Sequence, residues 1–164
     1  MRQSLVDVNV WIALLNIHHV HHLIVAQWFE TLSLEEAVLC RQVQLGVARL
    51  LSNRTIMQDA ALPAGEAWRI IGTLRDDERV QFADEPKIID AVLPTLFKYP
   101  APTGKLISDA YLAAFAIASS RRLVTLDQGF KQFQGLDAVI LTEPEAIPGK
   151  VSTPLKNGPG NAEG

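Results

Sequence analysis

The chain has 164 residues, a length that suits one domain with a single core. Apolar residues make up 48% of it and charged residues 20%, which excludes a disordered or collagen-like chain. Fifteen Lys and Arg against eighteen Asp and Glu give a formal net charge of −3, so nucleic-acid binding would have to come from a local site rather than from overall charge.

Five short apolar runs have the composition of strands that are covered on both faces. They are Leu5-Val6 with Val8, Ala37–Cys40, Val80–Phe82, Leu123–Leu126 and Ala138–Leu141. Between them, apolar residues recur at helical spacing in three groups: Val25, Trp28 and Phe29; Val47, Leu50 and Leu51; Leu112, Ala113 and Ala116. This alternation predicts an α/β fold with a mostly parallel sheet of about five strands and helices on both faces.

Pro and Gly concentrate near the end of the chain, where there is little to bury. We therefore expect one domain over residues 1–143 and a disordered tail over residues 144–164. The single cysteine, Cys40, excludes an intrachain disulfide. The longest apolar run, Ala110–Ala118, is far shorter than the roughly 20 residues of a membrane helix. We expect a soluble, cytoplasmic protein.

Acidic residues follow two of the predicted strands. Asp7 ends the first and Asp127 ends the fourth. Ligands bind at the carboxyl ends of the strands in sheets of this kind, so both residues are candidates for a site. The alternative, that each is a helix cap or turn former, carries about equal weight.

Asp109 lies in a predicted helix over about 104–119, on the same face as Leu112, Ala113 and Ala116. A charge on a buried face is costly unless it is paired or binds a metal ion. The simpler alternative is a residue at the rim that pairs with Lys105.

Gln44 shares a helix face with Val47, Ala48 and Leu51. The spacing alone favours a satisfied core amide over a functional group. Three carboxylates and this amide would nevertheless lie at one edge of the sheet. Oxygen ligands without His or Cys suit Mg²⁺ or Mn²⁺, and such a site suits hydrolysis of phosphodiesters.

Four segments together resemble the motifs of PIN-domain nucleases, in particular VapC-type toxins. They are residues 5–14, which contain Asp7 and Asn9, the helix segment Gln44–Leu51, residues 108–116 around Asp109, and residues 123–130 around Asp127. The histidine-rich region His18–Trp28 is also similar to that subgroup.

The resemblance implies a three-layer α/β/α domain that cleaves RNA, such as tRNA, rRNA or mRNA, with Mg²⁺ or Mn²⁺. It implies that the aspartates at 7, 109 and 127 hold the metal and that Asn9, Thr125 and Ser108 support them. It also implies a cognate antitoxin as partner, and a homodimer.

Gln44 departs from the family pattern, which commonly has Glu at this position. We expect one metal ion held by the three aspartates, with Gln44 orienting a metal-bound water or a neighbouring carboxylate. The alternative is a catalytically weak PIN-fold protein that binds RNA or a partner without cutting.

Two further residues are candidates for RNA contact. Arg41 flanks the predicted pocket, and His22 belongs to the cluster His18–His22. Such closely spaced histidines without a second cysteine do not suit a structural zinc site. A haloacid-dehalogenase-type phosphatase would also open with a strand and an Asp, but it needs a second Asp where this chain has Asn9.

Overall fold

The computed structural model describes residues 3–97 and 104–142. Within these ranges five strands form one sheet in the order β3-β2-β1-β4-β5, and all four pairings are parallel. The strands are β1 (Ser4–Val6), β2 (Ala37–Leu39), β3 (Val80–Phe82), β4 (Arg122–Thr125) and β5 (Ala138–Ile140). The predicted α/β fold is confirmed, and the sheet is entirely rather than mostly parallel.

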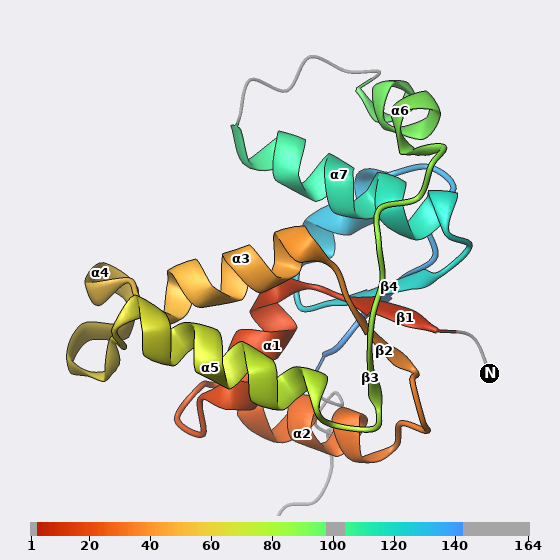
Figure 1. Cartoon of the computed structure of the whole chain (residues 1–164). Helices are drawn as coiled ribbons and strands as arrows, with labels where there is room; N and C mark the ends of the chain where they lie inside the picture. The colour runs from red at the N-terminus through yellow and green to blue at the C-terminus, as the bar shows by residue number, and fades with distance from the viewer. Residues whose placement is uncertain (1–2, 98–103, 143–164) are drawn as a thin grey trace, which may run out of the picture.

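Seven α-helices and three 3₁₀ segments surround this sheet in the described residues. The helices are α1 (Val8–Leu15), α2 (His22–Glu30), α3 (Arg41–Leu51), α4 (Arg54–Met57), α5 (Ala64–Arg75), α6 (Ile89–Val92) and α7 (Gly104–Ala118). The 3₁₀ segments are η1 (Gln58–Ala60), η2 (Leu93–Leu96) and η3 (Gln128–Gln132). In Figure 1, α6 and α7 lie on one side of the sheet and α1 and α2 on the other. This is the α/β/α arrangement that the resemblance implies.

The end of the first strand differs from the prediction. Val8 does not belong to the strand but is the first residue of α1. The reason is Asp7, which has an extended backbone and accepts a hydrogen bond from the Val8 backbone N–H through its own side chain, and so caps α1. The apolar pattern continues through this junction because β1 and α1 are both buried, so hydrophobicity alone does not reveal the boundary.

Small residues let two helices approach the centre of the molecule closely. Along α7, four alanines are fully buried, and this face of the helix packs on β4. On α3, a Cβ at Gly46 would meet Cγ2 of Val8 at 2.7 Å, so only glycine allows α3 this close to the start of α1. Both contacts bring helices to the carboxyl ends of β1 and β4.

Other parts of the chain were predicted less completely. The helix α5 was not predicted, although Ala67, Ile71 and Leu74 are buried along it at helical spacing. The predicted tail, 144–164, lies outside the described residues. Within the described ranges, no helix is both long and apolar enough to cross a membrane.

Candidate active site

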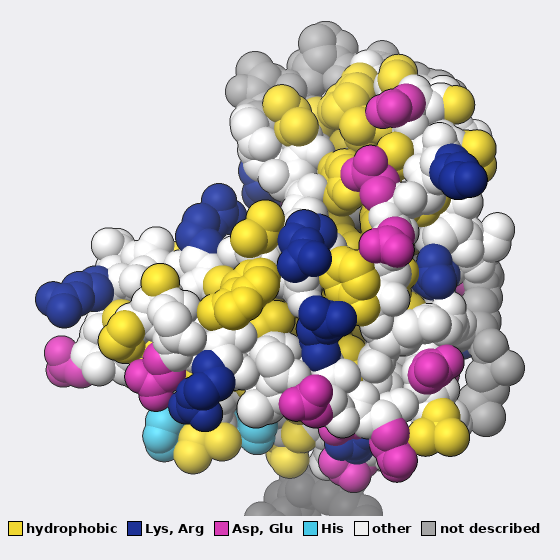
Figure 2. Space-filling view, viewed as in Figure 1, with side chains coloured by type: hydrophobic (Ala, Val, Ile, Leu, Met, Phe, Trp, Pro, Cys, Tyr) yellow, Lys and Arg dark blue, Asp and Glu magenta, His cyan; other side chains and the backbone are white. Residues whose placement is uncertain are grey.

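The chain order of the strands places a crevice between β1 and β4. From β1 the chain first adds β2 and β3 on one side and later β4 and β5 on the other, so the order reverses between β1 and β4. Ligands bind at such a switch point, outside the carboxyl ends of the strands. A pocket of about 1160 Å³ opens there. Figure 2 shows that the surface is hollowed between α7 and α3, with Lys and Arg side chains at the rim.

Six charged side chains line this pocket, three of each sign. They are Asp7, Asp109, Asp127, Arg41, Arg49 and Lys105. Asn9 and Ser108 line it as well. The fold therefore brings together the three predicted aspartates, although they are up to 120 residues apart in the chain.

Asp7 lies deepest among the three aspartates, with 7% of its surface exposed. Its Oδ1 accepts from the Val8 backbone N–H at 2.7 Å, and its Oδ2 accepts from the Thr125 hydroxyl at 2.7 Å. Burial raises the pKa of Asp7 to about 6 despite these two hydrogen bonds, and the charges of Asp109 and Asp127 act in the same direction. Asp7 is thus a carboxylate that a nearby positive charge would stabilise.

Thr125 and Asn9 connect the two strand ends beneath the pocket. The Thr125 hydroxyl is fully buried; besides donating to Asp7, it accepts from the Asp127 backbone N–H at 3.0 Å and from the Asn9 amide at 3.1 Å. Asn9 in turn accepts from the Leu126 backbone N–H at 3.2 Å. This network fixes the positions of Asp7 and Asp127 relative to each other.

Asp127 and Asp109 face a common cation, the Lys105 ammonium. Lys105 Nζ contacts Oδ2 of Asp127 and lies 3.8 Å from Oδ2 of Asp109. The hydrogen bond from Lys105, together with one from the Gly129 backbone N–H, holds the pKa of Asp127 below its usual value. Burial raises the pKa of Asp109, and Lys105 opposes that shift. Asp109 therefore lines the pocket and also forms the ion pair with Lys105 that the simpler alternative names.

The donor set at this pocket suits a hard divalent cation. Its acidic members offer only oxygen atoms, the ligands that Mg²⁺ and Mn²⁺ prefer. In residues 3–97 and 104–142, no three Asp, Glu, His or Cys side chains stand close enough together to enclose a metal ion as they are placed. A positive charge nevertheless already lies against two of the three aspartates, in the form of Lys105. The chemistry of the pocket thus fits a cation.

Gln44 lies beside the pocket but does not line it. Its side chain is completely buried, and its Oε1 accepts from Nη1 of Arg41 at 2.8 Å. Its Nε2 is buried without a hydrogen-bond partner among the described residues. The Arg41 guanidinium also lies 5.1 Å from the centre of the Phe82 ring. In this structure Gln44 therefore positions Arg41 and contacts none of the aspartates through a hydrogen bond.

His22 and Ser108 differ in their relation to the pocket. Ser108 lines it, is exposed, and accepts at its carbonyl from the Gln42 side chain at 3.4 Å. His22, the first residue of α2, does not line it; its Nδ1 lies 2.9 Å from the carbonyl oxygen of Ala13 in α1. The fold thus separates His22 from the other candidates.

Among the pocket residues that were not predicted as site residues are two cations and a tyrosine: Arg49, Lys105 and Tyr111. Tyr111 donates from its hydroxyl to Glu85 Oε2 at 2.5 Å, and burial together with this bond raises its pKa. Helical spacing gave a signal for one of them, since Lys105 lies one turn before Asp109.

Comparison with known proteins agrees with this architecture. A family model described as "PIN domain" matches residues 4–136. The chain is 35% identical over 144 residues to "Ribonuclease VapC41" of Mycobacterium tuberculosis, covering 85% of this chain and 99% of that protein.

Two solved structures are similar to the chain in fold. VapBC-1 from nontypeable Haemophilus influenzae matches with a TM-score of 0.59 and 19% identity, over 85% of this chain and 98% of the matched chain. VapC20 of Mycobacterium tuberculosis, described as a "Sarcin-Ricin loop cleaving toxin", matches with a TM-score of 0.57 and 17% identity, over 79% of this chain and 93% of the matched chain.

Proposed function

The chain belongs to the PIN-domain family, as a VapC-type member, and on that premise we propose that it is a metal-dependent endoribonuclease and the toxin of a type II toxin–antitoxin pair. The observation that supports this most directly is the pocket at the switch point, where the aspartates at 7, 109 and 127 lie with three basic side chains. Acidic groups suit a metal ion, and basic groups at the rim suit the phosphates of a nucleic acid.

Asp7, Asp109 and Asp127 are the residues that would hold Mg²⁺ or Mn²⁺. When bound, such an ion supplies Lewis-acid stabilisation of the charge that develops at a phosphodiester and lowers the pKa of water. The chain itself supplies the positions of the carboxylates. The Thr125 hydroxyl and the Val8 backbone N–H hold Asp7, and the Gly129 backbone N–H holds Asp127. These bonds leave Asp7 and Asp127 little freedom to reorganise, which favours catalysis.

Arg41 and Arg49 are the proposed contacts to the RNA backbone. Both line the pocket, and Arg41 is held in place by Gln44 and Phe82. Because Gln44 points to Arg41, we assign it the positioning of this guanidinium rather than of a metal-bound water. A neutral amide suits this role, because it needs no counter-charge when it is completely buried.

The partner and assembly also follow the family. We propose a cognate antitoxin that blocks the acidic pocket, a homodimer, and action in the cytoplasm on a structured RNA such as tRNA or rRNA, or on mRNA. The similarity to VapBC-1 and to the toxin VapC20 supports this proposal at the level of the fold.

The test is cleavage of total cellular RNA by purified, antitoxin-free protein with Mg²⁺ or Mn²⁺, compared with EDTA. Asp109→Asn removes one proposed metal ligand. Asp59→Asn makes the same change on η1, where Asp59 is exposed and does not line the pocket. We expect discrete fragments that require the metal, that disappear with Asp109→Asn and that remain with Asp59→Asn.

One result would overturn the proposal. If the protein binds RNA but cuts none of it with either metal, the chain is the non-cutting RNA-binding protein that the Gln44 departure suggests. Gln44→Glu would then show whether an acidic residue at this position restores cleavage.

A further inference from the structure

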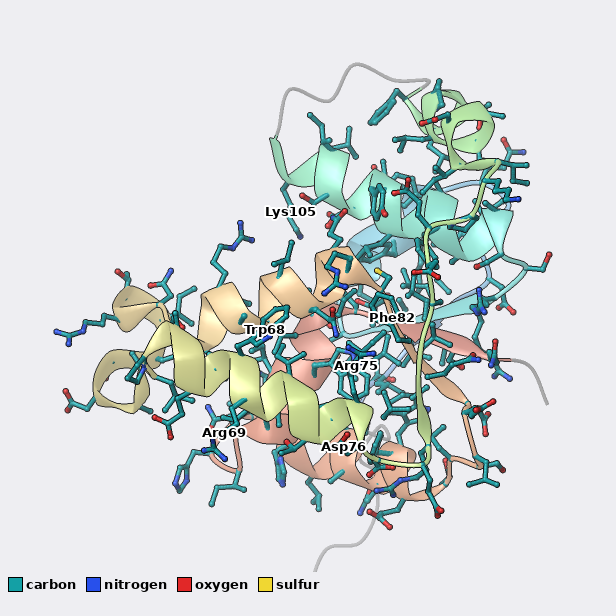
Figure 3. The ribbon with its side chains drawn as sticks, viewed as in Figure 1. Trp68, Arg69, Arg75, Asp76, Phe82 and Lys105 are labelled. Atoms are coloured by element: carbon teal, nitrogen blue, oxygen red, sulfur yellow. The ribbon has the colours of Figure 1, made fainter. Side chains whose placement is uncertain are left out.

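Lys105 brings a positive charge to two of the three pocket carboxylates. It lies in the first turn of α7, where its Nζ contacts Oδ2 of Asp127 and lies 3.8 Å from Oδ2 of Asp109. These two carboxylates come from different elements, the turn after β4 and the helix α7, and one ammonium group joins them. Figure 3 shows Lys105 extending from the start of α7 toward α3, and Lys105 lines the pocket between these helices.

The contact is one that can be broken without disturbing the core. The Lys105 side chain is 68% exposed, whereas those of Asp109 and Asp127 are 18% and 29% exposed. Ion pairs with so exposed a partner are weak, and salt screens them. Charge rather than packing therefore holds the ammonium in the pocket.

Arg41, another cation of the pocket, is held differently. Its guanidinium donates to the buried Gln44 at 2.8 Å and lies over the Phe82 ring. These contacts engage neutral groups and fix the side chain. Arg41 is thus directed by Gln44 and Phe82, whereas Lys105 is placed directly on the acidic side chains.

We propose that Lys105 is a displaceable internal cation of the acidic pocket, which bridges Asp109 and Asp127 in the metal-free protein and competes with a divalent ion for them. This inference rests on the proposed metal-dependent function. Lys105 then lowers the affinity of the pocket for the metal, because each ion that binds to both carboxylates must first displace the ammonium.

The experiment measures Mn²⁺ binding to the full chain by electron paramagnetic resonance, without RNA. Lys105→Met removes the ammonium, and Lys105→Arg retains a positive charge at the same position. Lys131→Met removes an equal charge from η3, four residues after Asp127, at an exposed residue that does not line the pocket.

We expect Lys105→Met to bind Mn²⁺ about tenfold more tightly than the unchanged chain, since one unit charge near 4 Å is removed from the site. Lys105→Arg and Lys131→Met should bind within about twofold of the unchanged chain. The metal-induced rise in Tm should be larger for Lys105→Met as well, because its unshielded carboxylates repel each other until the ion binds.

Each failure has its own signature. If Lys105→Met binds Mn²⁺ as the unchanged chain does, or more weakly, Lys105 does not compete and the inference is wrong, while metal-dependent cleavage still stands. If neither the unchanged chain nor Lys105→Met binds Mn²⁺ at millimolar concentration, the proposed metal site itself is wrong, and this inference with it.

Discussion

Two groups of acidic residues differ in how their charge is balanced, one at the amino end of the strands and one at their carboxyl ends. At the amino end of β3, Arg79 donates to Asp77 through Nε and Nη2, at 2.9 and 2.7 Å, and also pairs with Glu30 at 3.3 Å. Its guanidinium lies 4.1 Å from the centre of the Phe29 ring. The hydrogen bond from Arg79 holds the pKa of Asp77 below its usual value. The acidic charges of this cluster are therefore paired with Arg79 within the fold.

The carboxyl edge of β1 and β4 has the opposite balance. Asp109 and Asp127 share the exposed Lys105 ammonium, and burial raises the pKa of Asp7 to about 6. Carboxylates that are partnered within the fold contribute to stability, whereas carboxylates that lack sufficient positive charge cost stability and remain available to a ligand. The comparison teaches that a count of acidic residues does not identify a site, but the balance of charge around them does.

The largest difference between the two edges should appear in cleavage. Asp7→Asn and Asp77→Asn make the same chemical change in the two clusters. We expect Asp7→Asn to reduce metal-dependent RNA cleavage by about 100-fold or more, because a ligand is lost while the cap of α1 is retained by Asn. Asp77→Asn should cleave at the unchanged rate. Equal losses in the two variants would mean that the effect comes from folding rather than from the pocket.

The two edges should also respond to pH with opposite sign. The raised pKa of Asp7 means that the folded metal-free chain binds this proton more tightly than the unfolded chain, so stability falls as the pH rises from about 4 to 6. The change from 3.8 to about 6 corresponds to roughly 3 kcal/mol. The lowered pKa of Asp77 acts in the other direction, and its contribution is lost as the pH falls below about 4.

Urea unfolding in EDTA between pH 4 and pH 7 measures this effect. We expect Asp7→Asn to be more stable than the unchanged chain at pH 7. Its free energy of unfolding should fall much less between pH 4 and pH 6 than that of the unchanged chain. Saturating Mg²⁺ should remove the same fall from the unchanged chain, because the ion supplies the missing positive charge. Parallel pH profiles for the two chains would contradict the raised pKa of Asp7.

Removing the link beneath the pocket should have a smaller effect on stability. Thr125→Val keeps the shape of the side chain but removes the buried hydroxyl that connects Asp7, Asn9 and the Asp127 backbone. We expect a loss of about 2 kcal/mol in the free energy of unfolding, because buried polar groups lose their partner. Thr73→Val is the control, since its hydroxyl is on the exposed part of α5 and bonds only locally to the Ile70 carbonyl.

The smallest effect is expected at the satisfied cluster. Asp77→Asn should lower the free energy of unfolding by about 1 kcal/mol, since Asp77 and Arg79 are both about a quarter exposed and solvent screens the pair. Chemical unfolding at pH 7 measures this loss, and 1 M salt should reduce it. A larger loss that salt leaves unchanged would show that packing of Arg79 on Phe29 depends on Asp77.

The prediction from sequence was strongest where local pattern and burial agree. All five strands were found because short apolar runs are typical of a parallel sheet with both faces covered. Asp7 and Asp127 could be assigned to one edge because parallel strands end at the same side. It was weakest at junctions: Val8 was placed in a strand, because apolar spacing does not show where a strand becomes a helix. The helix α5 was not predicted, although three of its residues are buried at helical spacing.

By itself, then, the sequence determined the parallel α/β fold, the shared edge of the aspartates and, through its resemblance to PIN-domain nucleases, the family. The tertiary structure decided which side chains meet. It turned Gln44 toward Arg41, took His22 away to the Ala13 carbonyl, and placed Lys105 between Asp109 and Asp127. Sequence spacing defines the face of one helix, but the direction of a long polar side chain depends on charges and donors from other elements, which come together only when the chain is packed.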